Sequence, residues 1–443
     1  MPAPSLPTLV IYWTATAAGW IALTALAVVL AQRDKDLGAP GRSIAASVWI
    51  MLLTAAALRL AVVFTTTPTL SDDIWRYIHD GVAMRRDGNP YAVSPAERWP
   101  KVPHVERINH PHLVTIYQAT SQWVFAGVAH HDHTGMRLTF VLFDLWIVAL
   151  VLWKLVRDGR SVWWAALYAW HPLAVSEVAW SGHQDVIGIA WMLMALTLVD
   201  LQRAQRAGSS PPPPPEVGWA SRLRACSPVL AGGAMGLAIG VKPIVAPVAL
   251  VLAASLGKHA KPQAAFWGAL MVTLALLYVP FAMMEGGLGR MLDTVYAFTT
   301  QWRFNGPVHD GLAAVVGATA ARPLLAAAAL IVLGLACVRG WETWRGAHAF
   351  LLAMLVVSST VYPWYLLWVL PWAVVQLQRS GAAWAVWVLS LTLGWTYEVW
   401  LHADQWRVPG WLLAAVWVPG AVAWVVWKGG GGAKGQAAVR AGG

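Results

Sequence analysis

Two adjacent carboxylates are the residues of this sequence best suited to acid–base chemistry. They are Asp72 and Asp73, in the run Ser71-Asp72-Asp73-Ile74-Trp75-Arg76-Tyr77-Ile78-His79-Asp80-Gly81. A partly desolvated carboxylate beside a like charge has a raised pKa, which suits a general base. Such a pair could also bind a divalent metal ion or simply cap the first turn of a helix. Asp73 is the first candidate for a base and Asp72 the second, because neighbouring helical residues point about 100° apart.

The residues around the two carboxylates predict a short amphipathic helix. Ile74, Ile78 and Val82 recur every fourth residue and form an apolar stripe, while Asp73 and Asp80 belong to a polar one. This pattern is typical of a helix that lies on a membrane surface.

The chain that follows predicts a shaped loop and a second surface helix. Pro90 and Pro111 favour extended or turn backbone before them. The segment Leu113 to Ala129 is apolar but contains Thr, Gln and Ser, so a surface helix is a better interpretation than a membrane span. The next run, His130-His131-Asp132-His133, resembles a metal cluster, but consecutive residues cannot converge on one ion without strain. We interpret it as a solvated turn.

Composition indicates what must position these residues. The chain of 443 residues is 58% hydrophobic and 12% charged, whereas soluble domains carry about 25% charged residues. Apolar runs of about 20 residues, enough to cross a bilayer, recur from Leu9 to Trp427. We therefore predict an all-α polytopic bundle of about eleven to thirteen membrane helices, with residues 1–443 forming a single transmembrane domain. Cys226 and Cys337 are too few for a disulfide framework or a cysteine metal motif.

The distribution of charge predicts an orientation. The net charge of +10 comes from lysine and arginine in short loops, as expected of cytoplasmic loops rather than of a nucleic-acid surface. They include the proline-rich loop at residues 203–227 and a flexible tail at 428–443. Residues 66–136 then form one long external loop, where His, Asn and paired Asp residues concentrate. Lys242 is expected at the tip of a hairpin, since a lysine at mid-span costs about 2.5–3.5 kcal/mol.

A series of polar motifs occurs in a fixed order along the chain. In sequence order they are Asp72-Asp73 with Arg76-Tyr77 and Asp80-Gly81, Gly88-Asn89-Pro90-Tyr91, Asn109-His110-Pro111, Thr115-Ile116-Tyr117, Asp144, His171-Pro172-Leu173, Glu177, Ser181-Gly182-His183-Gln184-Asp185, Lys242-Pro243, Trp302-Arg303-Phe304-Asn305 and Pro363-Trp364-Tyr365. From Ser71 to about Trp372 this order resembles the GT-C superfamily of glycosyltransferases. It looks most like the bacterial polyprenol-phosphate-mannose-dependent mannosyltransferases.

The resemblance implies a GT-C-like fold and an inverting transfer from a polyprenyl-phosphate sugar, with Asp72 or Asp73 at the catalytic centre. The candidates for binding that substrate are Arg76, Tyr77, Asp80, Asn89, Tyr91, His110, His112, Tyr117, His183, Asp185, Lys242, Arg303, Asn305 and Tyr365. Lys242 and Arg303 could meet a leaving phosphate, or could only anchor the chain at the membrane interface. No metal ligand is assigned, although a divalent metal remains an open alternative.

Two further acidic residues, Asp144 and Glu177, lie inside apolar runs. Asp144 is interpreted as structural, with Arg137 two helical turns away as its nearest basic residue, because an unpaired buried charge is expensive. Glu177 is left without an assigned role.

The expected function is a glycosyltransferase of the cell membrane. It would transfer a sugar, mannose in the first instance, to an envelope glycan, lipid or protein acceptor on the external face, with membrane lipid and no nucleic acid as further partners. The main alternative is a transporter or a flippase for lipid-linked sugars, which typically shows internal repeats and a midplane site; a non-catalytic assembly factor is a third. No repeat is evident, and the polar residues gather on one side.

Overall fold

The chain folds almost entirely into helices. The computed structural model describes residues 6–37, 41–99, 101–102, 104–206, 218–402 and 407–430. The α-helices are α1 (Leu6–Leu37), α2 (Gly41–Thr65), α3 (Asp73–Asp87), α4 (Ala119–Val128), α5 (Asp132–Arg157), α6 (Ala166–Ala169), α7 (Pro172–Val175), α8 (Asp185–Arg206), α9 (Gly218–Ile239), α10 (Val248–Ser255), α11 (Ala260–Met283), α12 (Gly289–Gln301), α13 (Pro307–Val316), α14 (Ala318–Val338), α15 (Thr343–Val357), α16 (Leu370–Gln376), α17 (Gly381–Thr392) and α18 (Gly410–Gly430). Between them lie η1 (Val105–Arg107), η2 (Ala129–His131), η3 (Val162–Ala165), η4 (Ser176–Trp180), η5 (Pro243–Val245), η6 (Pro363–Trp368) and η7 (Leu393–His402). Over these residues the only extended pairing is an isolated bridge between Phe304 and Thr360.

Seven helical stretches of the described chain are long and apolar enough to cross a bilayer. They are Thr14–Arg33, Ile44–Thr65, Ala119–Arg157, Asp185–Arg203, Ala260–Met283, Ala318–Val338 and Gly410–Trp427. The protein is therefore an all-helical, multi-pass membrane protein. Three shorter apolar helices, Ala225–Ile239, Pro243–Ser255 and Thr343–Val357, add to these seven.

The predicted eleven to thirteen spans exceed the helices that meet this criterion, because two apolar runs are broken. Residues 162–180 fold as η3, α6, α7 and η4, and residues 363–402 fold as η6, α16, α17 and η7. Apolarity alone therefore overstates the number of continuous helices.

Burial differs sharply between inner and outer helices. In the most apolar stretch of α8, 78% of the residues are buried, against 22% in α11 and 17% in α18. The outer helices present large apolar side chains such as Leu276, Leu53 and Val425 to their surroundings. In water such surface would be a liability, whereas lipid solvates it.

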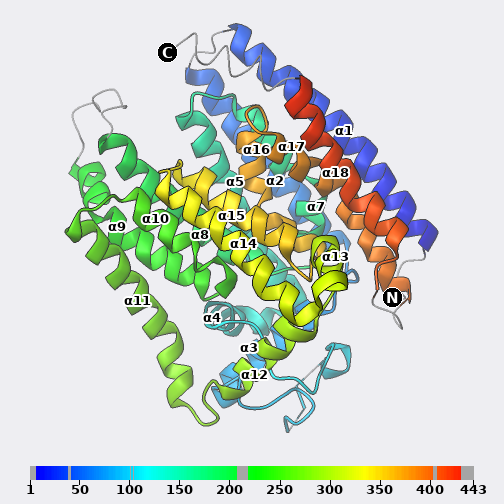
Figure 1. Ribbon diagram of the computed structural model, residues 1–443. Helices are drawn as coiled ribbons and strands as arrows, with labels where there is room; N and C mark the ends of the chain where they lie inside the picture. The colour runs from blue at the N-terminus through cyan, green and yellow to red at the C-terminus, as the bar shows by residue number, and fades with distance from the viewer. Residues whose placement is uncertain are drawn as a thin grey trace.

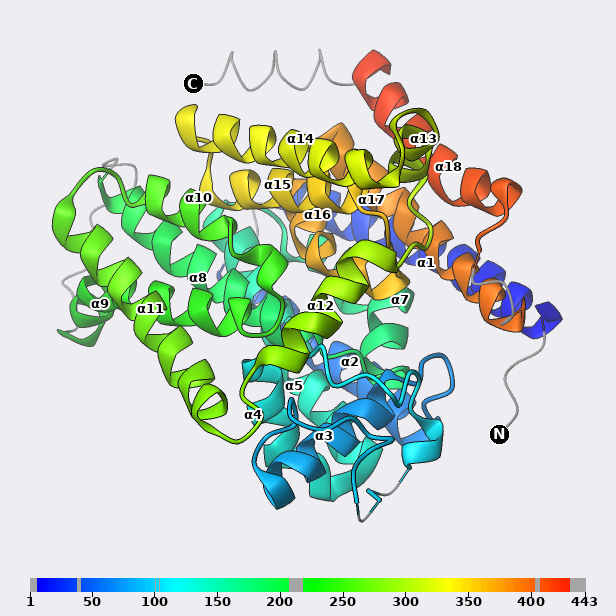
Figure 2. The same ribbon diagram turned by 60° about the horizontal axis from the view of Figure 1, so that its bottom comes forward.

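The helices form a bundle with one elaborated end. Helices α1 and α18 run along one flank, and α9 and α11 lie on the opposite one (Figure 1). Helix α9 packs against both α8 and α11, and α14 packs against α15. The short helices α3 and α4, together with α12, lie at the bottom of the bundle in Figure 1, the end that comes forward in Figure 2.

The chain reverses direction at Lys242-Pro243, as the hairpin interpretation required. Lys242 Nζ donates to Asp185 Oδ1 at 2.7 Å, at the start of α8. After the turn, Ser255 accepts a hydrogen bond from Thr343, and both residues lie near Arg203 at the far end of α8, which donates to the carbonyls of Gly340 and Trp341. We call the end with Asp185 and Lys242 the site end, and the end with Arg203 and Thr343 the basic end.

Helices form at both positions where the sequence predicts surface helices, but α3 is buried along its apolar and its polar face, from Ile74 to Gly81, and is therefore packed inside the protein rather than laid on its surface. Helix α3 packs closely on α4: a Cβ atom on Gly81 would lie 2.4 Å from the Phe125 carbonyl oxygen, so this contact requires glycine. Helix α4 has ten residues, too few to cross a bilayer by itself, and η2 separates it from α5.

The buried Asp144 has a different partner from Arg137, the residue suggested by the sequence. Its carboxylate pairs with the fully buried Arg59 and accepts a hydrogen bond from Tyr168 at 2.5 Å. Arg137 instead donates to the carbonyls of Val63, Thr66 and Ala179. These carbonyls lie where helices end or are irregular, so they lack helical donors and attract the guanidinium.

The two cytoplasmic segments predicted from composition fall partly outside the described residues. The proline-rich loop at 203–227 is shorter than predicted, because α8 continues to Arg206 and α9 begins at Gly218; residues 207–217 lie outside the described chain. Of the predicted tail, Lys428 to Gly430 belong to α18, and 431–443 lie outside it.

Candidate active site

Only one carboxylate of the Asp72-Asp73 pair faces the interior of the bundle. Asp73 opens α3, and its side chain is 18% exposed, 3.8 Å from His183 Nε2 and within 3.5 Å of the Asn109 amide. Asp72 occupies the N-cap position, is exposed, and forms no capping hydrogen bond with its side chain. Ser71 Oγ instead accepts from the backbone N–H of Asp73. Partial desolvation, followed by the Asp73 charge, raises the pKa of Asp72.

His183 connects Asp73 to a second, fully buried carboxylate. Its Nε2 lies 3.2 Å from Ser71 Oγ, and its Nδ1 lies 2.9 Å from Glu177 Oε2. Glu177 is completely buried, and Tyr397 Oη lies 2.9 and 2.8 Å from its two carboxylate oxygens. The order Asp73, His183, Glu177, Tyr397 is therefore a chain of polar groups that runs from a partly open carboxylate into the core.

Irregular backbone makes this chain possible. Glu177 lies in η4, a single π-helical turn, a feature that often marks functional sites. Gly182 has φ +74°, and a Cβ atom there would lie 2.7 Å from Ile74 Cδ1 and 3.1 Å from Arg137 Cγ. The turn that carries His183 is thus pressed against α3 and requires glycine.

A line of stacked rings leads to His183. The His183 and Trp364 ring centroids are 3.9 Å apart, Trp364 stacks on Tyr362 at 4.6 Å, and Tyr362 stacks on Phe304 at 4.8 Å. Burial raises the pKa of Tyr362, and the Asp73 charge adds to this effect. The stack and the carboxylate therefore share one electrostatic environment.

An ion pair between the buried Asp185 and the partly exposed Lys242 borders the same region. Asp185 Oδ1 accepts from Lys242 Nζ at 2.7 Å and from Trp368 Nε1 at 2.6 Å. The Lys242 ammonium lies 3.6 Å from the centroid of the Tyr365 ring, a cation–π contact. The Lys242 side chain is still 24% exposed, so it keeps access to an anion.

A second polar cluster, centred on Asp80, lies about two turns further along α3 than Asp73. Asp80 accepts from Arg76 Nε and lies 3.1 Å from His79 Nδ1, and Gln122 donates to its other oxygen. Burial raises the pKa of Asp80, but Arg76 and His79 outweigh it, and the net effect is a lowered pKa. Arg76 also donates to the Leu113 carbonyl, so the Arg76–Asp80 pair joins α3 to the chain around Leu113.

Several predicted binding residues make hydrogen bonds or ring contacts within the protein. Asn89 donates to the carbonyls of Glu285 and Gly287, and the Tyr91 hydroxyl donates to the Tyr117 carbonyl. The Tyr77 ring is buried between Tyr117 and Phe125. Buried Asn305 donates to the Val361 carbonyl and accepts from Trp417.

The remaining residues predicted to bind substrate lie on the protein surface, which we call the rim of the site. His110, His112 and Arg303 are exposed, and the His110 ring packs edge-on against Trp302, with centroids 5.2 Å apart. Desolvation and the neighbouring His112 lower the pKa of His110. The neutral imidazole can therefore accept or donate a hydrogen bond at the rim.

The side chains of the run His130-His131-Asp132-His133 do not converge on one metal-ion position. His130 Nδ1 lies 3.0 Å from Arg85, while Asp132 lies 3.9 Å from His104 and 3.8 Å from His133. Among the described residues, no three His, Cys, Asp or Glu side chains are arranged to hold a metal ion.

Sequence reasoning did not assign three residues of this site. No local sequence pattern assigns a role to Glu177, Tyr397 or Trp368. The π-helical turn and the return of residues 363–402 to the site end bring them together. Comparison of the chain with known protein families, with curated proteins and with solved structures finds no match.

Proposed function

We propose that this protein is a GT-C-like membrane glycosyltransferase with Asp73 as its general base. The donor would be a sugar, mannose first, on a polyprenyl phosphate, and the acceptor a hydroxyl of an envelope glycan, lipid or protein. The single observation that carries the proposal is the placement of Asp73: a partly open carboxylate backed by buried His183 and Glu177.

The reaction needs a base, a stabilised leaving group and a surface for the sugar. The acceptor oxygen attacks the anomeric carbon, its proton passes to Asp73, and the bond from that carbon to the phosphate oxygen breaks with its electron pair leaving on the phosphate. No covalent enzyme intermediate is required for inversion.

The groups around Asp73 suit these tasks. His183 and Glu177 hold the carboxylate in place, as positioning residues. Lys242, the partly exposed cation beside Asp185, is the best-placed donor for the leaving phosphate. The Trp364 and Tyr362 stack offers a flat aromatic surface to a sugar ring or prenyl chain.

We also propose on which side of the membrane the site lies. Arg203 and the loop before Thr343 gather at the basic end, and basic loops face the cytoplasm. Asp73 at the opposite end would then act on the external face of the cell membrane.

Transfer assays with matched asparagine variants test the proposal. The purified chain in lipid nanodiscs is given radiolabelled polyprenyl-phosphate mannose or glucose and a panel of glycan and lipid acceptors. Asp73→Asn should lower kcat by about 10²–10⁴-fold, whereas Asp72→Asn, which alters the exposed neighbour, should cost less than about tenfold.

Three results would count against the proposal. Equal turnover in both variants would remove Asp73 as the base. A larger loss in Asp72→Asn would exchange the two roles. Absence of any transfer, with uptake of lipid-linked sugar across vesicles, would favour the transporter or flippase.

A further inference from the structure

A large cavity of the bundle lies away from Asp73, at the basic end. It has a volume of about 1060 Å³ and lies between α14, α15 and the segment from α16 to α18. This volume is at the upper limit of pockets that bury a small ligand. None of the candidate active-site residues lines it.

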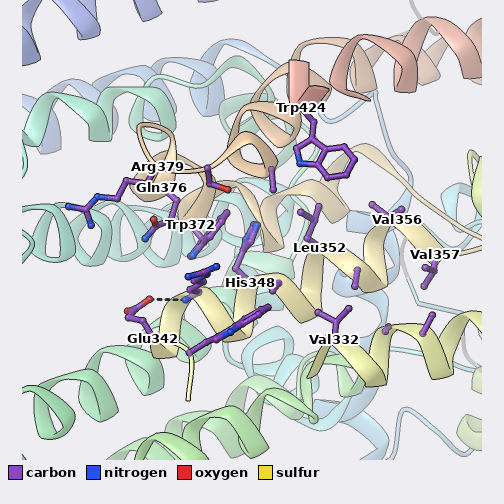
Figure 3. A pocket seen from close by; sticks show the side chains of 18 of the residues that line it. Val332, Glu342, His348, Leu352, Val356, Val357, Trp372, Gln376, Arg379 and Trp424 are labelled. Atoms are coloured by element: carbon purple, nitrogen blue, oxygen red, sulfur yellow. Dashed lines mark hydrogen bonds between the residues drawn. The ribbon is translucent and has the colours of Figure 1, made fainter. Parts of the chain in front are cut away.

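The cavity is charged at one end and apolar at the other. Figure 3 shows Arg379 and Glu342 at one end, with Val332, Val356 and Val357 toward the other. Along α15, Arg345 and Val357 are twelve residues apart, or about 18 Å. This is more than half of the roughly 30 Å hydrocarbon core of a bilayer.

Three acidic side chains near the charged end of the cavity, which we call its mouth, all contact the same lysine. Lys154 Nζ lies 3.0 Å from Asp158, 3.1 Å from Asp200 and 3.2 Å from Glu342. Among the described residues, no carboxylate lies within ion-pair distance of the guanidinium groups of Arg345 and Arg379, which are both exposed. The Glu342 carboxylate accepts from the backbone N–H of Arg345, and the Arg345 guanidinium lies over the Trp341 ring. The mouth therefore presents two guanidinium groups without anionic partners.

A third arginine strengthens this positive field. Arg160 donates to Gln378, next to Arg379, and its Nε and one terminal nitrogen are buried without hydrogen-bond partners in the described chain. Burial, followed by the Arg379 charge, lowers the pKa of Arg160 to about 10. An anion at the mouth would relieve this repulsion.

Inside the cavity a buried histidine lacks polar partners. His348 is 3% exposed, lies one helical turn deeper than Arg345, and stacks on Trp372 (Figure 3). Neither ring nitrogen of His348 nor the Trp372 indole nitrogen has a hydrogen-bond partner in the described chain. Buried polar groups are normally satisfied, so these donors point to an acceptor within the cavity.

We propose that this cavity binds one membrane phospholipid with an anionic headgroup. Its phosphate lies between Arg345 and Arg379, an ester carbonyl accepts from His348 or Trp372, and one acyl chain follows the apolar wall to Val357. The order of charge, ester and hydrocarbon along such a lipid matches the order of groups along α15. This inference does not depend on the proposed glycosyl transfer.

Native mass spectrometry of the purified, delipidated full chain tests the site. The probes are phosphatidylglycerol, phosphatidylcholine, glycerophosphate and polyprenyl phosphate. One phosphatidylglycerol should bind at least about tenfold more tightly than phosphatidylcholine or glycerophosphate. The double variant Arg345→Gln/Arg379→Gln should lose this preference, while Arg33→Gln, which removes an exposed arginine on α1 that does not line the cavity, should retain it.

A second variant tests the acyl-chain portion without changing charge. Ala353 lines the apolar wall, and Ala353→Phe should reduce phosphatidylglycerol binding at least about tenfold, with an unchanged thermal unfolding transition as the check of folding. Equal phosphatidylglycerol binding by wild type and both cavity variants would overturn the proposal. So would glycerophosphate binding as tight as the lipid, or a loss of polyprenyl phosphate binding in the two cavity variants that exceeds their loss of phosphatidylglycerol binding.

Discussion

Three carboxylates at the site end and two arginines at the basic end differ in whether they have partners of opposite charge or hydrogen-bond donors. At the site end, Asp80, Asp185 and Glu177 each accept at least two short contacts from neighbouring side chains. At the basic end, Arg345 and Arg379 face a large cavity with no carboxylate partner among the described residues.

This difference suits the two ends to different functions, catalysis at the site end and ligand binding at the basic end. Fixed, mutually bonded polar groups cost little to reorganise during a reaction, which is the condition for electrostatic catalysis. Cations without a carboxylate partner beside an apolar cavity are suited to binding a ligand that carries an anionic group.

The largest loss of activity expected from this comparison follows from the substitution of Glu177. Glu177→Gln removes the charge that faces His183 Nδ1, so Asp73 loses its positioning. We expect kcat to fall by about 10- to 100-fold, with a changed pH profile of kcat/KM in the transfer assay.

Asp200→Asn is the matched control. Asp200 is also a buried carboxylate, but it pairs with Lys154 near the basic end of α8. Its substitution should leave both kcat and the pH profile unchanged. Similar losses of kcat in the two variants would mean that Glu177 serves only the stability of the fold.

A smaller effect is expected from one methyl group in the His183 turn. Gly182→Ala meets both a positive φ and contacts to Ile74 and Arg137 that are too short, so it should displace His183. Gly340, with φ +60°, has open space around its Cβ position. Both variants should lose about 1–2 kcal/mol of stability from backbone strain, but only Gly182→Ala should lose activity, by about tenfold.

Thermal unfolding and transfer kinetics of the two glycine variants separate these effects. If Gly340→Ala loses as much activity as Gly182→Ala, the close packing of the His183 turn on α3 has no special role.

The sequence predicted the class of fold and the first helix of the site, because both follow from local pattern. Apolar runs indicate membrane helices, and the spacing of Ile74, Ile78 and Val82 indicates α3, which forms from Asp73. The partners of buried charges could not be predicted in this way. Arg59 is 85 residues from Asp144, and Tyr397 is 220 residues from Glu177, so only the packing of the bundle determines these pairs.

The smallest expected effect is a gain in stability on removing the outer carboxylate. The pKa of Asp72 is raised in the folded state, so between the unfolded and folded pKa values the folded protein binds more protons. Stability then falls as pH rises through this window, and above it the wild type carries the full penalty. Asp72→Asn should therefore be more stable than wild type at pH 7, by less than about 1 kcal/mol because the side chain is exposed, and equally stable at pH 3. Thermal unfolding at both pH values measures the difference, and a loss of stability at pH 7 would show that the Asp72 charge stabilises α3 as a helix-dipole partner instead.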